Sequence, residues 1–278
     1  MAVRFSPFLI VLCAFVAACG SRTGKSFVPT LDGYDEKGRQ TFVLHDDLLE
    51  ISGFVLLDTN NIAAINDERG QLYFLNLQTD SIQSFRFKGK GDYEDLVKVG
   101  NRFYVLESNG DIVETVPPYD NHTTYKFKIK GKKEFESLVW YSDLNKLVLI
   151  TKDQRKKTQD GITAYAFDLD TKQFDQIPFF EITLKDIFIK LSSYNAECKP
   201  SGAALHPINK RLYIIASIGK LLLECEPTGK LVKIFKINPT HFPQPEGINF
   251  AANGDMYISN EGADGKATVL KYPYVGKK

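Results

Sequence analysis

The sequence has few of the residues from which redox, zinc and nucleic-acid sites are built. Its 278 residues include four cysteines and four histidines, and no Cys-x-x-Cys or Cys/His spacing typical of a zinc site occurs among them. Basic and acidic residues number 35 and 34, which leaves a formal net charge of +1 and no electrostatic argument for a nucleic-acid partner. The Gly-x-Ser-x-Gly motif of serine hydrolases is also missing. With these motifs missing, the carboxylates are the remaining candidates for a functional site.

An apolar run long enough to span a membrane is missing as well. Phe8 to Val16 is apolar but much shorter than the ~20 residues of a spanning helix. It follows Arg4 and leads into Ala17-Ala18-Cys19, where small residues precede a cysteine as in a bacterial lipobox. The pattern predicts a lipoprotein signal peptide over residues 1–18 and lipidation of Cys19. An ordinary signal peptide with an incidental cysteine is the alternative.

The expected mature chain is therefore held on a membrane of the bacterial cell envelope by acyl chains. Residues 19–40 are polar and unpatterned, which predicts a flexible tether, and residues 41–278 remain for one domain. Gly20 and Ser21 provide no acidic retention signal, so the outer membrane is favoured.

Two cysteines remain once Cys13, in the signal peptide, and Cys19 are set aside. Cys198 and Cys225 could form a disulfide in an oxidising exterior, or stay as two buried thiols. The sequence leaves both open.

A short signature, an acidic residue or serine followed by a small or acidic residue and then an apolar one, recurs five times. The copies are Ser52-Gly53-Phe54, Glu94-Asp95-Leu96, Glu136-Ser137-Leu138, Ser201-Gly202-Ala203 and Glu246-Gly247-Ile248. Successive copies start 42, 42, 65 and 45 residues apart. A period near 40–45 residues with about four short strands per unit is typical of propeller blades. We therefore predict an all-β chain with five blades.

The two ends of the domain are expected to meet in one blade. The chain stops one strand short after residues 268–272, and the strand-like segment 41–44 has no blade of its own. Pairing the two would close the ring and remove its exposed edges. A sixth blade would fit only in the 65-residue step, whose surplus is better assigned to the polar loop 154–160 and to a short helix. That helix is indicated by an apolar stripe at Leu184, Ile187, Phe188 and Leu191, and it either packs on the propeller or moves as a lid.

Several carboxylates should meet at one mouth of the channel, because equivalent positions of successive blades form a ring. The members of this ring are Glu94, Glu136 and Glu246 at strand starts, with Glu107, Glu261 and Asp67 at the ends of the neighbouring strands. Two unit charges ~5 Å apart repel by roughly 3 kcal/mol at an effective dielectric constant near 20. Such a cluster must hold protons, recruit Lys152 or bind a cation. Oxygen ligands without His or Cys favour Ca²⁺, with Mg²⁺ second. The alternative is that these side chains only cap backbone N–H groups in a wet channel.

The motifs together resemble those of the SdiA-regulated propeller family over residues 45–275. The resemblance is carried by the lipobox, Glu50-Ile51-Ser52-Gly53, Asp92-Tyr93-Glu94-Asp95-Leu96, Phe135-Glu136-Ser137-Leu138, Lys199-Pro200-Ser201-Gly202 and Gln244-Pro245-Glu246-Gly247-Ile248. It implies a five-bladed propeller akin to NHL repeats that binds calcium at its acidic site, and it implies no catalytic activity. Asp95 and Ser137 depart from the pattern, since each stands where glycine is expected after the glutamate.

Two functions remain open at this stage. The first is a non-catalytic, monomeric binding module for an unidentified ligand or envelope protein, favoured because no histidine lies among the repeats as a general base. The second is a metal-dependent hydrolase of lactones or phosphoesters, in which Asn66, Asn109 and Asn260 would be neutral ligands and Lys152 or Glu136 the base.

Overall fold

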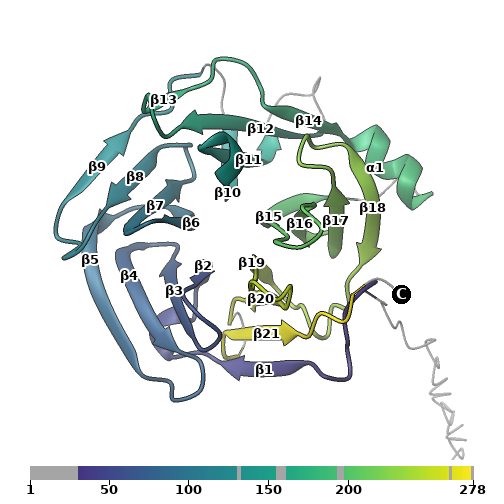
Figure 1. Cartoon of the computed structure of the whole chain (residues 1–278), viewed down its shortest axis with the longest axis horizontal. Coiled ribbons are helices and arrows are strands. Elements are labelled where there is room, and N and C mark those ends of the chain that lie inside the picture. Colours follow the sequence, from purple (N-terminus) through teal and green to yellow (C-terminus); the bar gives the residue numbers. More distant parts are fainter. Residues whose placement is uncertain (1–30, 130–132, 155–160, 193–196, 263–264, 277–278) are drawn as a thin grey trace, which may run out of the picture.

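The computed structural model describes residues 31–129, 133–154, 161–192, 197–262 and 265–276. Their strands form five antiparallel sheets arranged around a central axis (Figure 1). The expected five-bladed, all-β propeller is thus confirmed. Residues 1–18, Cys19 and residues 155–160, to which the sequence assigned a signal peptide, a lipid site and a loop, lie outside the described residues.

Each blade takes its strands from a continuous stretch of sequence, except the last. Blade 1 contains β2 (Ile51–Leu56), β3 (Asn61–Asn66), β4 (Arg69–Asn76) and β5 (Ile82–Lys90), and blade 2 contains β6 (Tyr93–Val99), β7 (Arg102–Glu107), β8 (Ile112–Thr115) and β9 (His122–Tyr125). Blade 3 contains β10 (Lys133–Tyr141), β11 (Lys146–Gln154), β12 (Gly161–Asp168), β13 (Gln173–Phe174) and β14 (Phe180–Thr183). Blade 4 contains β15 (Lys199–Leu205), β16 (Leu212–Ile218), β17 (Leu221–Cys225) and β18 (Leu231–Lys236), and blade 5 contains β19 (Pro245–Phe250), β20 (Met256–Asn260), β21 (Thr268–Tyr272) and β1 (Gln40–Val43). Two short 3₁₀ helices, η1 (Asp46–Leu48) and η2 (Ser142–Leu144), lie outside the sheets.

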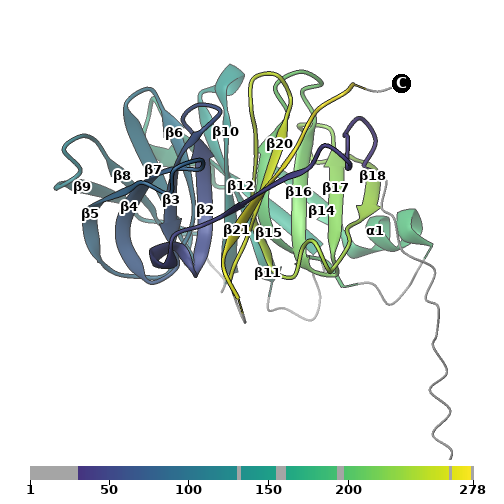
Figure 2. The same cartoon turned by 90° about the horizontal axis from the view of Figure 1, so that it is seen from below.

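The first strands, β2, β6, β10, β15 and β19, line the channel and run from one face of the disc to the other (Figures 1 and 2). Their sequences are apolar because blades pack on both of their sides, and separate apolar clusters fill the spaces between successive blades. Outer hairpins turn through Asx-type contacts. For example, Asp168 Oδ1 accepts hydrogen bonds from the backbone N–H groups of Asp170 and Thr171.

The ring closes as the sequence predicts. β1 pairs antiparallel with β21, with Phe42 opposite Val269 and Val43 opposite Thr268. β1, the first strand in the sequence, therefore forms the outermost strand of the last blade. It covers the edge of β21 that would otherwise be open.

Residues 31–40, which the sequence assigned to the tether, contact the propeller. Leu31 is buried in the core between blades 4 and 5, and Tyr34 forms an isolated bridge with Tyr274 while its hydroxyl donates to the Gly254 carbonyl. Asp32 also pairs with Lys233. Residues 31–40 thus belong to the propeller, because Leu31 and Tyr34 pack against it. The polar residues around them gave no sign of this packing in the sequence.

The described residues of the 65-residue step form no sixth blade. Its surplus lies in blade 3, where β13 and β14 both pair with β12, and in α1 (Leu184–Leu191). Thr183 caps this helix, since its Oγ1 accepts a hydrogen bond from the Asp186 N–H at 3.1 Å. Ile187 is fully buried in the core between blades 3 and 4. The helix is therefore packed against the propeller, as the first alternative predicted.

Cys198 and Cys225 are both buried free thiols in that same core. Burial raises the pKa of each to about 12, which leaves them protonated and unreactive at neutral pH. Within the described ranges, no helix has the length and apolar character needed to cross a membrane.

Candidate functional site

Each of the five inner strands carries a β-bulge at the same position of the repeat. The register shifts fall at Ser52, Glu94, Glu136, Ser201 and Glu246, the first residues of the five signatures. A bulge inserts one unpaired residue and re-aims its side chain. The repeated signature is therefore the sequence mark of a bulge, and it explains why these five positions share one mouth of the channel.

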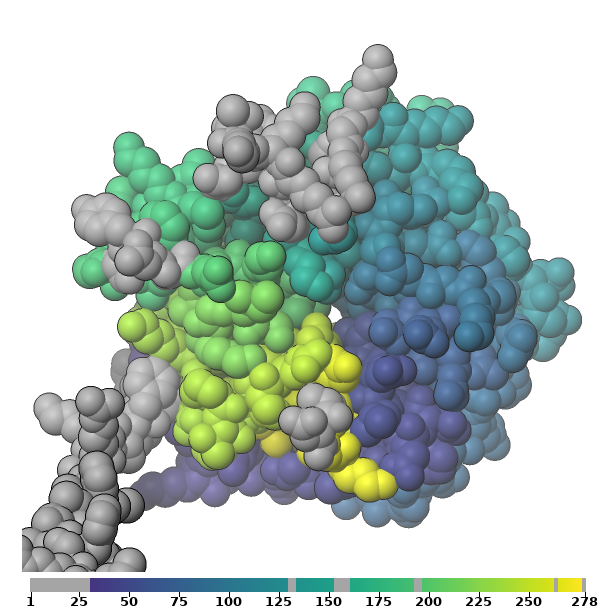
Figure 3. All heavy atoms as spheres, turned by 180° about the vertical axis from the view of Figure 1, so that it is seen from behind, coloured from purple at the N-terminus to yellow at the C-terminus, as the bar shows by residue number. Residues whose placement is uncertain are grey.

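Glu94, Glu136 and Glu246 interact at this mouth, as the sequence predicts. The charge of Glu136 acts on both Glu94 and Glu246, and the charge of Glu246 acts on Glu94. The face at which these strands begin is seen in Figure 3, where the surface is hollowed at the centre of the disc. Blades 2, 3 and 5 therefore contribute one carboxylate each.

Lys152, near the end of β11, provides the positive charge of the cluster. Its Nζ lies 2.6 Å from Glu136 Oε1. Burial alone would lower the pKa of Lys152, but the carboxylate of Glu136, with Glu94 and Glu246 further away, holds that pKa above its usual value. The lysine thus remains charged beside three acids, which would leave two excess negative charges if all four groups were ionised.

Burial and the neighbouring negative charges raise the pKa values of the three carboxyl groups. Burial, followed by the charges of Glu136 and Asp92, raises the pKa of Glu94 to about 9. Burial and the charges of Glu136 and Glu261 raise the pKa of Glu246 to about 8. The pKa of Glu136 is also raised by burial, although Lys152 opposes the shift. At neutral pH the metal-free cluster therefore holds one ion pair and two protonated carboxyl groups.

A second group of acids continues the mouth over blades 5 and 1. Gln244 donates a hydrogen bond from Nε2 to Glu261, and burial, Asp67 and Glu50 raise the pKa of Glu261. Burial and the charges of Glu50 and Glu68 raise the pKa of Asp67, whose Oδ1 is buried without a hydrogen-bond partner. Glu261 and Asp67 thus lie at the predicted mouth, beside the inner three.

Glu107 is placed differently from the other predicted ligands. It ends β7 opposite Tyr93, and its Oε1 lies 2.5 Å from Lys88 Nζ of blade 1. β7 has no bulge at this position, so the ordinary alternation of the strand sends the side chain towards β5. Its charge is balanced there by Lys88.

Asp92 is the acid that the sequence reasoning overlooked. Its charge acts on both Glu94 and Glu136, and its carboxylate accepts a hydrogen bond from Ser108 Oγ. The signal was present, since Asp92 stands two residues before Glu94 in the same motif.

The neutral side chains suggested as ligands are mostly engaged locally. Asn66 Oδ1 accepts from the Arg69 N–H, and Asn109 forms hydrogen bonds with Asp111 on both sides of its amide. Asn260 differs, because its amide nitrogen lies 3.3 Å from both the His241 carbonyl and Thr268 Oγ1, whereas its buried Oδ1 has no partner.

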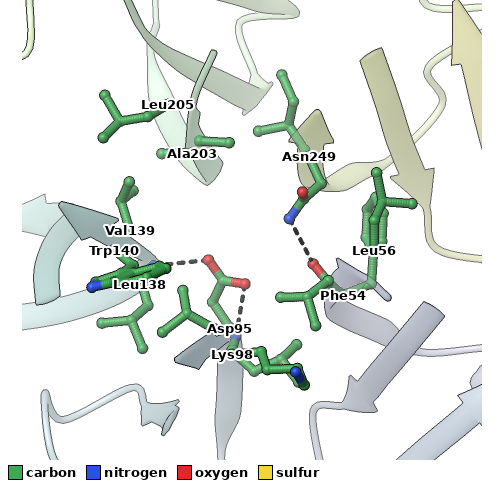
Figure 4. Close-up of a pocket in the computed structure, with 15 residues that line it drawn as sticks. Phe54, Leu56, Asp95, Lys98, Leu138, Val139, Trp140, Ala203, Leu205 and Asn249 are labelled. Carbon is green, nitrogen blue, oxygen red and sulfur yellow. Dashed lines mark hydrogen bonds between the residues drawn. The ribbon is translucent and has the colours of Figure 1, made fainter. Parts of the chain in front are cut away.

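Asp95 follows the bulge of blade 2 and connects it to blade 3. Its Oδ1 accepts from its neighbour Leu96 and its Oδ2 from Leu138 of the next blade, both at 2.8 Å (Figure 4). At the equivalent glycines the next blade comes so close that a Cβ on Gly53 would lie 2.6 Å from Asp95 Oδ1, and one on Gly202 2.6 Å from the Glu246 carbonyl oxygen. The departure from glycine at Asp95 therefore replaces a close backbone approach with a carboxylate bridge.

Beyond Asp95 most of the residues that line the channel are apolar. A pocket of about 200 Å³ is lined there by all five inner strands, with Phe54, Leu138 and Ile248 among its walls. Figure 4 shows the Asp95 carboxylate directed into this space, and Asn249 Nδ2 donating to the Phe54 carbonyl on the other side. The acidic mouth and the apolar end thus occupy opposite ends of one channel.

The chemistry of the mouth fits calcium in donor type and charge. Among the described residues, the acids that influence one another at the mouth offer carboxylate oxygens, which are the donors that Ca²⁺ prefers. In the parts of the chain that the structure describes, however, no three His, Cys, Asp or Glu side chains already stand together as a metal-binding group. The Lys152 ammonium holds Glu136 instead, so a metal ion would have to replace it and two protons.

No family model and no curated protein matches this sequence. Solved structures do match by shape. The glutaminyl cyclase of Myxococcus xanthus aligns with a TM-score of 0.56 and 13% identity over 86% of this chain and 96% of that one. A Bacteroides thetaiotaomicron protein of unknown function aligns with a TM-score of 0.52 and 9% identity over 87% of this chain, which spans 61% of that protein. A chain of the nidogen/laminin complex gives a TM-score of 0.51 and 10% identity over 76% and 72%. At these identities the likeness shows the propeller fold alone.

Proposed function

We propose that this chain is a lipid-anchored protein of the bacterial cell envelope, and that its propeller binds Ca²⁺ at the acidic mouth and serves as a non-catalytic binding module. The lipobox before Cys19 supports the anchor. The observation that carries the calcium site is the convergence of Glu94, Glu136 and Glu246 on one lysine, with their pKa values raised.

Without a metal ion, the positive charge at the mouth is too small for its carboxylates. The buried Glu136 and the partly buried Glu94 and Glu246 share one ammonium, and two of the three carboxyl groups keep protons at a cost that a divalent cation would remove. Calcium supplies two positive charges to oxygen ligands, which matches the charge that the cluster lacks. Binding should therefore release protons as the carboxylates ionise.

A non-catalytic role is favoured by the surroundings of the mouth. Of the four histidines, His206 is packed among aromatic rings and His45 caps η1. His122 lies on β9 and His241 lies near Arg39 and Glu36. None of these positions provides a general base beside Glu94 or Glu246.

The test is calorimetric titration of the exported chain with calcium at pH 7, in two buffers of different ionisation enthalpy. We expect stoichiometric binding with the release of roughly one to two protons per ion. A Glu94→Gln, Glu246→Gln double variant should lose this binding, whereas Glu181→Gln, on an exposed part of β14, should bind as the parent does.

Absence of calcium binding by the parent protein, or unchanged binding by the double variant, would remove the proposed site. Calcium-dependent turnover of a lactone or phosphoester by the parent protein would favour the hydrolase instead.

A further inference from the structure

The channel pocket beyond Asp95 lies apart from the proposed calcium site and is large enough for a small molecule. Its volume is about 200 Å³, and its lining comes from all five inner strands. A cavity of roughly 150 Å³ lined by apolar side chains can hold a benzene ring. The pocket therefore has room for a ring or a short chain that carries one small substituent.

Backbone groups of the inner strands face this pocket in a ring. The third residue of each signature lines it, and each of these residues stands one position after its bulge in the pairing with the second strand of the blade. The five residues are Phe54, Leu96, Leu138, Ala203 and Ile248. The side of an inner strand that faces away from the second strand is a sheet edge, so its N–H and C=O groups must find partners in the channel.

Polar side chains satisfy several of these backbone groups. Asp95 accepts from the N–H groups of Leu96 and Leu138, and Asn249 donates from Nδ2 to the Phe54 carbonyl at 3.3 Å (Figure 4). In a β-strand the N–H and C=O groups of one residue point to the same side. The carbonyls of Leu96 and Leu138 therefore also face the channel, where they can accept a hydrogen bond from a ligand.

The Asp95 carboxyl group keeps hydrogen-bonding capacity towards the pocket. Each of its oxygens accepts one backbone N–H, and a carboxylate oxygen has two lone pairs. Asp95 is 7% exposed and is the one acidic side chain among the described residues that line the pocket. A hydroxyl group suits Asp95 in either protonation state, since it can donate to a carboxylate and accept from a carboxylic acid.

Charged ligands are disfavoured in this pocket. An anion would lose its hydration beside Asp95, and Lys98, the one basic residue in the described lining, is exposed and donates from Nζ to the Gly100 carbonyl at 2.7 Å. Figure 4 shows the Lys98 ammonium directed away from the Asp95 carboxyl group. A cation could pair with Asp95, but burying two charges costs about as much as their attraction returns. The surroundings therefore favour a neutral polar group.

We propose that the pocket beyond Asp95 binds a small neutral alcohol with an apolar body. The hydroxyl group of the ligand lies at Asp95 and the neighbouring backbone carbonyls, and the body lies against apolar side chains such as Phe54 and Ile248. The inference names a ligand class for the proposed binding role and in that sense rests on it. The site is separate from the acidic mouth and requires no calcium.

Trp140 makes occupancy of the pocket measurable, because it is the only tryptophan in the sequence and lines the pocket. The experiment follows its fluorescence while the exported chain is titrated with benzyl alcohol in EDTA. We expect saturable binding with a Kd of about 1 mM or lower, which is attainable for a ligand of this size. Toluene lacks the hydroxyl group, and benzoate and benzylammonium carry a charge on the same ring. All three should bind at least fivefold more weakly.

Two matched phenylalanine substitutions test the location. Asn249 is half-buried and its amide lies in the pocket (Figure 4), so Asn249→Phe should fill the space and weaken the binding of benzyl alcohol at least tenfold. Asn101→Phe, in the exposed turn between β6 and β7, lies outside the lining and should bind as the parent does. Circular dichroism establishes whether both variants are folded, and the ligand series on the parent protein decides independently of them.

A parent protein that binds calcium but not benzyl alcohol would overturn the pocket and leave the calcium site standing. Binding of benzyl alcohol without any calcium binding would support the pocket and remove the calcium proposal. Equal affinity of the parent and a folded Asn249→Phe variant would overturn the location. Binding of toluene or of either charged analogue as tightly as benzyl alcohol would overturn the assignment of a neutral alcohol.

Discussion

Asp95 connects two blades through its carboxylate, at a position where other blades have a glycine in close contact with the next blade. It is buried among the inner strands and accepts two backbone N–H groups, one from its own blade and one from the next. Burial raises the pKa of this carboxyl well above its usual range. The bridge is therefore a local device that ties blades 2 and 3 together beside the channel.

Replacing Asp95 with alanine should lower the free energy of unfolding by about 2 kcal/mol, because the buried Leu138 N–H loses its acceptor. Urea denaturation monitored by circular dichroism measures the change. Asp120→Ala, at an exposed loop position, should lie within about 0.5 kcal/mol of the parent. A loss equal to that of the control would mean that the bridge contributes nothing to stability.

Glu94 makes stability depend on pH in a direction opposite to that of most carboxylates. Its pKa is about 9 in the folded protein and near 4.5 in the unfolded chain, so folding is favoured by this group below pH 4.5 and less so as the pH rises towards 9. In EDTA, the stability of the parent relative to Glu94→Gln should fall by on the order of 2 kcal/mol between pH 5 and pH 7.

Thermal or urea unfolding of both proteins at the two pH values provides this comparison, which cancels the contribution of the groups that do not interact with Glu94. Saturating calcium should abolish the trend, since the metal stabilises the ionised carboxylate. A relative stability that stays constant or rises with pH in EDTA would contradict the crowded, protonated cluster.

At the scale of the elements, α1 packs against blades 3 and 4. Ile187 is fully buried in the core between blades 3 and 4, and on the same helix Ile189 is 61% exposed. Ile187→Ala should therefore lower the free energy of unfolding by about 2–4 kcal/mol. Ile189→Ala should change it by less than about 0.5 kcal/mol, and equal effects of the two substitutions would indicate a helix that detaches as a lid.

The inner strands also show what could be predicted from sequence and what could not. The repeated signature located the first strand of all five blades, and the structure shows a bulge at each copy, because duplication repeats both the residue type and the backbone irregularity. Glu107 could not be placed in the same way. Its direction depends on the register of β7 against β6, and a shift of one residue would send it to the other face.

The other features that the sequence did not predict depend on contacts between segments that are distant in the chain. Leu31 and Tyr34 looked like part of a polar tether, since partners such as Phe235 and Tyr274 lie more than two hundred residues further along the chain. The neighbourhood of Lys152 and Lys220 was equally hidden, because the packing of blade 3 against blade 4 brings them into the lining of one pocket.

At the scale of the whole molecule, stability depends on ring closure by β1. This strand covers the edge of β21, and Leu44 directly after it is buried in the core between blades 5 and 1. A chain beginning at residue 45 should melt roughly 10 °C or more below a chain beginning at residue 31, since the strand and its apolar contacts are lost. It should also associate through the open edge, which size-exclusion chromatography detects.

Closure can be tested independently of aggregation by supplying the missing strand as a peptide. A peptide of residues 31–44 should restore the melting temperature of the shortened chain, because an open edge binds an extended segment through backbone hydrogen bonds and side-chain pockets. The same peptide with Phe42→Pro loses a backbone donor opposite Val269 and should fail to restore it. If the shortened chain were monomeric and as stable as the longer one, the ring would be held by contacts between blades alone, and the role of β1 would be limited to the position of the N-terminal segment.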